Sequence, residues 1–215
     1  KKEGLQLRNI VFMGMGEPFL NYPEVNKALE IFCGPKFLNF SERRVTISTC
    51  GIVPGIKKLM VDHPQVSLAI SLHAPNDEAR KSIMPVDNTY PLDVLMKTLD
   101  EYVEKTNKRI FYEYIMIQGV TDKLPYAYEL ADLMEGRLGH VNFIPYNAGE
   151  GIMGNDMQPT PSLMIKKFQR VLEERGIPST VRFTMGDDID AACGQLALKV
   201  DGKKVAEVQG KRIAG

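Results

Sequence analysis

The chain has 215 residues, 44% of them hydrophobic and 25% charged, a balance that suits one large globular domain and excludes a disordered or low-complexity protein. Its formal net charge is zero, so a polyanionic partner would have to be recognised by local basic patches. Three cysteines without metal-ligand spacing favour a reducing, cytoplasmic setting, and apolar runs too short to span a bilayer predict no membrane association.

Short apolar runs alternate with amphipathic stretches along the chain. Runs rich in Val, Ile, Phe and Tyr predict strands at residues 9–16, 43–51, 65–74, 109–119, 140–147 and 179–186. Amphipathic stretches, several of which open with proline, predict helices at residues 22–33, 53–62, 77–84, 91–106, 125–135 and 161–176. This alternation predicts an α/β fold with a parallel sheet, which is either covered on both faces or forms the wall of a barrel.

Polar and glycine-rich segments follow the predicted strands. They read GMGEP, STCG, SLHAPND, QGVTD, PYNAGEG and MGDD in chain order. Ligands bind at the carboxyl ends of the strands in α/β barrels and open α/β sheets, so these segments predict one pocket at one rim. The competing interpretation is that loops of this kind are polar simply because they are exposed.

Two residue types at this rim carry a chemical prediction. Glu17, in GMGEP, can accept hydrogen bonds from an ammonium group, and the flanking glycines let the backbone approach a ligand closely. Of the three histidines only His73 falls at the predicted rim, whereas His63 and His140 are expected to be structural. The chain has no GxSxG elbow, and its scattered histidines argue against a metal hydrolase.

The motifs occur in an order that resembles a known family. GMGEP with a following PEV and ALEIF, then RRVTISTCG, AISLHAPND, FIPYN and GDDIDAACGQLA, are similar to the RlmN/Cfr family over residues 9–198. Members of that family are radical S-adenosylmethionine (SAM) enzymes that methylate carbon 2 or carbon 8 of an adenine in 23S ribosomal RNA. The last motif is most similar to the RlmN branch, which methylates carbon 2 and also acts on certain tRNAs. The resemblance implies a partial (β/α) barrel at residues 1–198, with about six parallel strands and its N-terminal strand or strands missing, followed by a basic Gly/Lys-rich tail at residues 199–215.

The resemblance also implies roles for individual residues. Cys193 would be the catalytic methyl carrier, which takes a methyl group from one SAM before a radical derived from a second SAM abstracts hydrogen from that methyl. Glu17 would accept from the α-amino group of SAM. The other implied SAM contacts are Gly16, Ser48, Ser71, Leu72, His73 and Asn147. The implied partners are 23S rRNA, tRNA as a second candidate, and an electron donor such as flavodoxin, acting on a monomeric enzyme.

Two departures from the family pattern determine what activity we expect of this chain. The CxxxCxxC motif that holds the family's 4Fe-4S cluster, and the second cysteine that resolves the methylated intermediate, do not occur before GMGEP in this chain. We therefore expect the C-terminal catalytic segment of a longer enzyme, inactive by itself. The alternative is a truncated, non-catalytic SAM- or RNA-binding protein of the same fold. Met185 stands where relatives usually have arginine, which puts a contact near Cys193 in doubt.

Overall fold

Six parallel strands form the sheet of this protein, and they lie side by side in the order in which they occur in the chain. They are β1 (Ile10–Phe12), β2 (Val45–Thr49), β3 (Ser67–Ser71), β4 (Ile110–Met116), β5 (Gly139–Pro145) and β6 (Ser179–Val181). Five of the strands fall inside runs that the sequence predicts as strands, and β5 begins at Gly139, one residue before its predicted run. The α/β class and the partial-barrel architecture are thereby confirmed.

The structure is a computed structural model and describes residues 7–14, 16–84, 89–146 and 157–182. Two predicted site residues, Asn147 and Cys193, lie outside these residues, as does the predicted tail at residues 199–215. Within the described ranges, no helix has both the length and the apolar character needed to cross a membrane.

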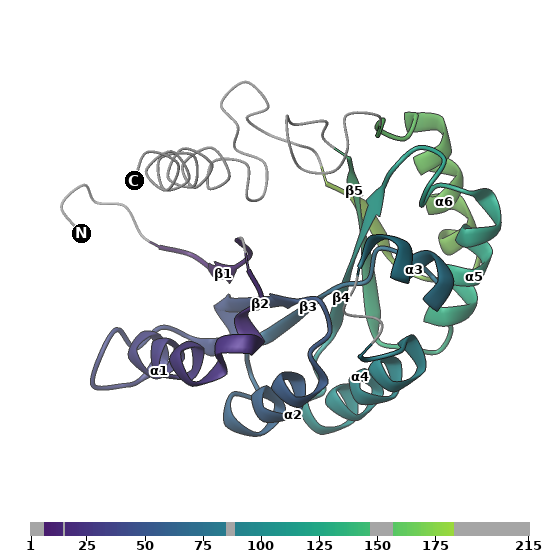
Figure 1. Ribbon diagram of the computed structural model, residues 1–215. Helices are drawn as coiled ribbons and strands as arrows, with labels where there is room; N and C mark the ends of the chain where they lie inside the picture. The colour runs from purple at the N-terminus through teal and green to yellow at the C-terminus, as the bar shows by residue number, and fades with distance from the viewer. Residues whose placement is uncertain (1–6, 15, 85–88, 147–156, 183–215) are drawn as a thin grey trace, which may run out of the picture.

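The helices connect successive strands and lie on one side of the arc that the strands make (Figure 1). The α-helices are α1 (Tyr22–Cys33), α2 (Val53–Asp62), α3 (Asp77–Ile83), α4 (Leu92–Thr106), α5 (Leu124–Met134) and α6 (Ser162–Glu174). Two short 3-10 helices, η1 (Pro18–Asn21) and η2 (Glu42–Arg44), precede α1 and β2 and were not predicted from the sequence. The helix α6 ends at Glu174, two residues before the end of its predicted range, with Gly176 in the left-handed region (φ 69°) just after the cap residue Arg175.

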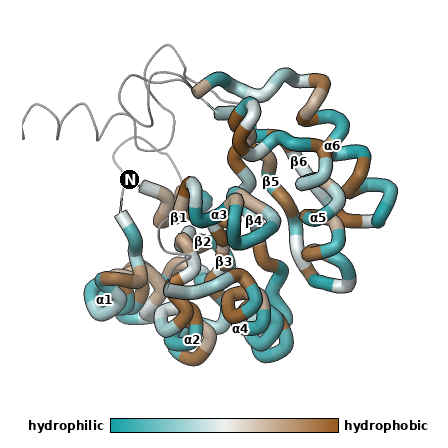
Figure 2. Tube along the Cα trace, turned by 45° about the vertical axis from the view of Figure 1, so that its right-hand side comes forward, coloured by the Kyte–Doolittle hydropathy of each residue, from teal (hydrophilic) through white to brown (hydrophobic). Residues whose placement is uncertain are grey.

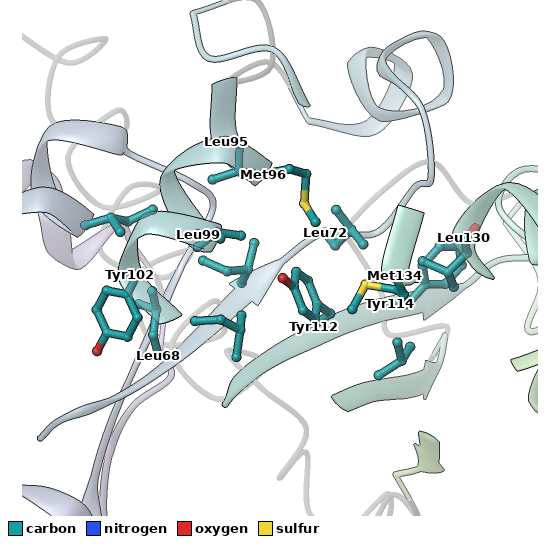
Figure 3. Packing of buried hydrophobic residues seen from close by; sticks show 14 of the residues in the cluster. Leu68, Leu72, Leu95, Met96, Leu99, Tyr102, Tyr112, Tyr114, Leu130 and Met134 are labelled. Atoms are coloured by element: carbon teal, nitrogen blue, oxygen red, sulfur yellow. The ribbon is translucent and has the colours of Figure 1, made fainter. Parts of the chain in front are cut away.

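The two faces of the sheet have different side chains. In β2, β4 and β5, alternate residues are buried and half-buried, because successive side chains of a strand point to opposite faces. The buried set, which includes Ile47, Tyr112 and Phe143, packs into the apolar core beneath the helices. Figure 3 shows part of this core, in which Leu95, Met96 and Leu99 of α4 approach Leu68, Leu72 and Tyr112. Figure 2 shows hydrophilic and hydrophobic residues alternating along the helices, as expected of helices that cover a core with one face.

The half-buried set lies on the opposite face, which we call the inner face. It is more polar than the core side. On β2 to β6 the inner face carries Thr46, Ser48, Ser67, Ala69, Ser71, Phe111, Glu113, Ile115, His140, Asn142, Ile144 and Thr180, all half-buried except the buried Ala69 and the exposed Thr180. A parallel sheet with helices on one side therefore presents a polar inner face together with a rim at the carboxyl ends of its strands.

Candidate functional site

Glu17 ties the end of β1 to the end of β2. Its Oε1 accepts hydrogen bonds from Thr49 Oγ1 (2.8 Å) and from the main-chain nitrogen of Phe19 (3.0 Å). Its Oε2 accepts from the main-chain nitrogen of Cys50 at 2.7 Å. The bond to Phe19 makes Glu17 the N-cap of η1. This half-buried carboxylate is held in place by the protein before any ligand arrives.

Two glycines allow this arrangement. Gly16, which precedes the carboxylate, has a φ of 93°, a conformation that side chains rarely adopt, and a Cβ there would meet nothing within 4 Å. Conformation therefore demands glycine at that position, and open space is left beside it. At Gly55 of α2, glycine is required by lack of space and not by backbone conformation, since a Cβ would lie 2.4 Å from Phe19. Its missing side chain lets α2 pack directly against η1, which carries Phe19 and follows Glu17.

Arg80 joins the ends of β2 and β3 from α3. Its side chain is fully buried, and Nη2 donates to the carbonyl oxygen of Cys50 at 2.7 Å while Nε donates to that of Leu72 at 3.2 Å. A longer contact of 3.5 Å joins Nη2 to the carbonyl oxygen of Ser71. The peptide of Cys50 thus donates to Glu17 through its N–H and accepts from Arg80 through its C=O. Three segments predicted to form one rim are connected by these hydrogen bonds.

Arg80 could not be recognised as a site residue from the sequence. It stands in a charged stretch, DEARKS, beside the exposed Lys81, and nothing in the local pattern marks one of these two cations as buried. A buried arginine needs acceptors for its donors, and here main-chain carbonyls supply them. The only available signal was its place four residues after Asn76, which caps α3 by accepting from the main-chain nitrogen of Ala79.

The predicted ligand-binding residues of β2 and β3 divide into two kinds. Ser48 and Ser71 are half-buried on the inner face, and their hydroxyl groups make no hydrogen bond to any other described residue. Leu72 points the other way: its side chain is fully buried in the core, its N–H donates to the carbonyl of Glu113, and its C=O accepts from Arg80. The two hydroxyls are available to a ligand, whereas Leu72 is engaged by the protein itself.

His73 lies at the rim in an unusual backbone conformation. Its φ is 60°, in the left-handed region, and its N–H donates to the carbonyl of Glu113. Its Nδ1 accepts a hydrogen bond from the main-chain nitrogen of Ile115 at 3.2 Å, so the proton of the neutral ring sits on Nε2. Burial, reinforced by the positive charge of Arg80, lowers the pKa of His73 to about 4. At neutral pH the ring is therefore an uncharged hydrogen-bond donor.

This depressed pKa predicts a pH-dependent stability. The unfolded chain takes up a proton on His73 as the pH falls through about 6.5, whereas the native state resists protonation down to about pH 4, so the fold loses stability across this window. We expect a loss of roughly 1–2 kcal/mol from this residue, because the ring is half-buried and water screens part of the effect. Urea unfolding at pH 7, 6, 5 and 4 would show a shallower pH dependence in His73→Asn, a residue that tolerates the left-handed conformation. Identical slopes in the two proteins would contradict the assignment.

Cys50 stands between Glu17 and Arg80 but does not present a reactive thiol. Burial, with help from a hydrogen bond to Glu17 and the carboxylate's negative charge, raises the pKa of Cys50 to about 12. The thiol stays protonated at physiological pH, and the thiolate is the nucleophilic form. Cys50 is a structural residue of this site.

The alkylation rate of Cys50 tests this conclusion. In a Cys33→Ser/Cys193→Ser variant, iodoacetamide at pH 8 should label Cys50 roughly a thousandfold more slowly in the native chain than in urea, because the thiolate fraction falls with the raised pKa. Mass spectrometry of timed samples gives both rates. Comparable rates in native and unfolded protein would show that the thiol is neither buried nor bound to Glu17.

The other two histidines lie away from the rim. His63 is buried, with Nδ1 2.9 Å from Glu42 Oε1 and Nε2 2.9 Å from Asn26 Oδ1, and it joins the end of α2 to α1 and η2. His140 lies near the start of β5 on the inner face, where its Nε2 is 3.1 Å from Thr180 Oγ1. The structural role predicted for His63 is confirmed, and His140 belongs to a polar network that the sequence did not reveal.

The described residues do not fit a 4Fe-4S cluster. Such a cluster is held by cysteine thiolates, and Cys33 packs against the core at the end of α1 whereas Cys50 follows β2. Within the described ranges no three His, Cys, Asp or Glu side chains gather in a group that could hold a metal ion. These residues do fit the amino-acid portion of SAM, since Glu17 offers a fixed carboxylate, Gly16 an open backbone, and Ser48 and Ser71 unengaged hydroxyls.

Comparisons with known sequences place the chain among SAM-dependent radical proteins. The sequence profile of the radical SAM superfamily matches residues 2–131. A protein named probable dual-specificity RNA methyltransferase RlmN from Thermoanaerobacter sp. (strain X514) is 48% identical over 194 residues, which are 90% of this chain and 56% of that protein. The RlmN 2 protein of Protochlamydia amoebophila (strain UWE25) is 44% identical over 92% of this chain and 54% of its own length. The chain thus spans about half the length of the curated relatives it matches.

Comparisons with solved structures agree on the fold. A radical SAM methyltransferase from Sphaerobacter thermophilus is 44% identical and superimposes with a TM-score of 0.85 over 90% of this chain and 56% of that one. A domain of a pyruvate-formate lyase-activating enzyme from Bacteroides vulgatus superimposes with a TM-score of 0.62 over 81% of this chain and 99% of that one. At 16% identity the second likeness concerns the fold alone.

Proposed function

Because this chain belongs to the radical SAM superfamily and is a homologue of the RlmN RNA methyltransferases, we propose that it is the SAM-binding, methyl-accepting part of an RNA adenine methyltransferase. The observation that carries the proposal is the hydrogen-bonded link of Glu17, Cys50 and Arg80. That link holds the predicted SAM-binding segments after β1, β2 and β3 at one rim. A site held rigid in this way suits recognition of a charged ligand, since little ordering remains to be done on binding.

The amino-acid end of SAM matches the groups at this rim. The carboxylate of Glu17 accepts hydrogen bonds from its ammonium group, and the glycine backbone at Gly16 permits close approach. Ser48 and Ser71 offer hydroxyls that donate or accept as the ligand requires. Asn147, which follows β5 in the sequence and lies outside the described residues, is proposed as a further contact.

Cys193 is proposed as the acceptor of the methyl group. Its sulfur, as the thiolate, attacks the methyl carbon on the sulfonium of SAM, a carbon–sulfur bond forms as the old one breaks, S-adenosylhomocysteine leaves, and the thiol proton is released to solvent. The proposed final acceptor is carbon 2 of an adenine in 23S rRNA or tRNA. The relatives' name, probable dual-specificity RNA methyltransferase RlmN, supports RNA as the substrate, whereas the adenine and its carbon 2 are proposed from the resemblance of the sequence motifs.

One observation favours a second candidate for the chain by itself. Its described residues supply no ligand set for the iron–sulfur cluster that radical SAM chemistry uses, so a protein that binds SAM or RNA without completing the reaction also fits them. The two candidates differ at Cys193. A methyl carrier becomes methylated, whereas a binding protein does not.

Intact-mass spectrometry after incubation with SAM tests the proposal. We expect one added methyl group on the full-length protein, absent from Cys193→Ala and retained in Cys33→Ser. SAM labelled with deuterium in the methyl group identifies the source of the added mass. Binding of SAM without any adduct would reject the carrier role and support the second candidate.

A further inference from the structure

A row of polar side chains crosses the inner face below the rim. Ser71, Glu113, Asn142 and Thr180 occupy directly adjacent register positions on β3, β4, β5 and β6. We call these four residues the inner polar row. In a parallel sheet, residues paired in this way project from the same face, so one end of the row adjoins the proposed SAM site through Ser71.

Hydrogen bonds along the row have a fixed direction. Thr180 Oγ1 donates to Asn142 Oδ1 at 2.6 Å, which leaves that hydroxyl to accept from His140 Nε2 at 3.1 Å. Asn142 Nδ2 in turn donates to Glu113 Oε1 at 2.9 Å. If the Asn142 amide turned over, its oxygen would face Glu113 Oε1 and the bond to the carboxylate would be lost. The chain of bonds fixes the orientation of Asn142 and of the carboxyl group beyond it.

The row leaves one acceptor and one donor unused side by side. Glu113 Oε2 has no hydrogen-bond partner among the described residues, and neither has the second hydrogen of Asn142 Nδ2. Burial raises the pKa of Glu113, opposed by the bond from Asn142 and the charge of Arg182. Neither atom is buried away from water, so both can exchange solvent for the polar groups of a ligand.

A pair of rings and a pair of aliphatic side chains flank the row, an arrangement suited to a flat ring. On the amino-terminal side of Glu113 and Asn142, Phe111 and His140 form a tilted ring pair with centroids 6.1 Å apart. On the carboxyl-terminal side, Ile115 pairs with Ile144. A narrow polar strip between aromatic and aliphatic walls is the usual composition of a small-molecule site.

We propose that Glu113 and Asn142 read the amine-bearing edge of an adenine ring. Glu113 Oε2 accepts from the exocyclic N6 amine of adenine. The second hydrogen of Asn142 Nδ2 is donated to the adjacent ring nitrogen, N7. Asparagine reads this same pair of atoms in adenine by offering one donor and one acceptor. Guanine and hypoxanthine carry a carbonyl in place of the amine and would place two acceptors together. The inference rests on the proposed function, which supplies two sources of adenine: the cofactor and the target base.

The isosteric variant Glu113→Gln tests the reading, because it should invert the preference. Its amide oxygen keeps the bond from Asn142, so the amide nitrogen replaces Oε2 and offers a donor where the native protein offers an acceptor. The wild type should bind 5′-methylthioadenosine about tenfold or more tightly than 5′-methylthioinosine, which lacks the amine. In Glu113→Gln we expect that ratio to fall below one. Loss of fold alone would weaken both ligands equally and would not invert their ratio.

Two ligand sets distinguish the two sources of adenine. Calorimetric titrations with the methylthionucleosides report the cofactor's adenine, and titrations with single-stranded oligoadenylate and oligoinosinate report the target base. If Glu113→Gln inverts the preference within either pair of ligands, the proposal is supported, and the pair that responds identifies the source of the adenine. Thr46→Val, on the same face near the start of β2, is the matched control and should leave both ratios unchanged.

Other results overturn this inference without touching the proposed function. An unchanged preference in Glu113→Gln, with wild-type affinity for SAM and normal urea unfolding, would show that the inner polar row does not meet adenine. Asn142→Ala provides a second test, because it removes the donor. It should weaken binding of adenine ligands about tenfold and leave binding of free methionine unaffected. Equal loss for methionine would contradict a base-reading role. Failure of SAM and methionine to bind the wild type would instead reject the proposed function.

Discussion

Arg80→Met is expected to lower the free energy of unfolding by about 3–5 kcal/mol, the largest effect of any single substitution at the rim. The guanidinium is fully buried and donates to the carbonyls of Cys50, Leu72 and Ser71. Methionine fills much of the same volume but leaves these buried acceptors without donors. Urea unfolding followed by circular dichroism should show the midpoint falling by about 2 M.

The adjacent residue provides the matched control for Arg80. Lys81 is exposed on the same helix, so Lys81→Met removes one positive charge from α3 with an expected change below about 0.5 kcal/mol. Arg80→Lys should lie between these values, because an ammonium group keeps the charge but cannot reach separate carbonyls with a planar fork. A loss in Arg80→Met no larger than that in Lys81→Met would show that the guanidinium does not support the strand ends.

Glu17→Gln is expected to weaken SAM binding roughly thirtyfold or more, through the loss of a charge-assisted bond to the ligand's ammonium group. The substitution also places an amide where the carboxylate now accepts from Thr49, Phe19 and Cys50. Because 5′-methylthioadenosine lacks the amino acid, its affinity should fall much less than that of SAM. Isothermal titration of both ligands gives the two values.

Glu24→Gln is the control for Glu17. Glu24 lies in the first turn of α1, where it is exposed and pairs with the exposed Lys27, and its substitution should not affect binding of either ligand. If Glu17→Gln weakened SAM and 5′-methylthioadenosine by the same factor, the carboxylate would be a structural tie between β1 and β2 and not a ligand for the ammonium group.

The elements of the fold could be predicted because their patterns are local. The helices Tyr22–Cys33 and Val53–Asp62 begin and end where the apolar spacing and the early prolines predict. The strand at residues 45–49 shows the alternation of buried and half-buried residues that a sheet with unlike faces requires. The 3-10 helix η1 was missed because it depends on Glu17, whose capping bond goes to the nitrogen only two residues later.

The site could be predicted in outline but not in its connections. Strand-end logic places Glu17, Ser48, Ser71 and His73 at one rim, as the structure has them. The residues that organise the rim act through tertiary contacts with no sequence pattern. Arg80 reaches the carbonyl of Cys50 thirty positions away, and Asn142 reaches Glu113 at a separation of 29. Alternation alone could have placed Glu113 and Asn142 on the inner face, but the register that pairs them becomes known only when β4 and β5 are aligned.

Leu72 shows how a correct location can hide a different role. The SLH segment lies at the rim as predicted, but alternation turns the Leu72 side chain into the core between β3 and α4 while Ser71 faces the inner side. Its main chain is used by Glu113 and Arg80. A list of contacts taken from motifs does not distinguish residues that touch a ligand from residues that position the ligand-binding residues.

Titration of the ¹⁵N-labelled chain with SAM, followed by NMR, tests most directly whether the rim of β1, β2 and β3 is the SAM site. The account predicts saturable amide shifts that centre on Gly16, Cys50 and His73, and that disappear in Glu17→Gln while the rest of the spectrum stays folded. Saturable shifts confined to another part of the chain, or none with the wild type at millimolar SAM, would contradict it.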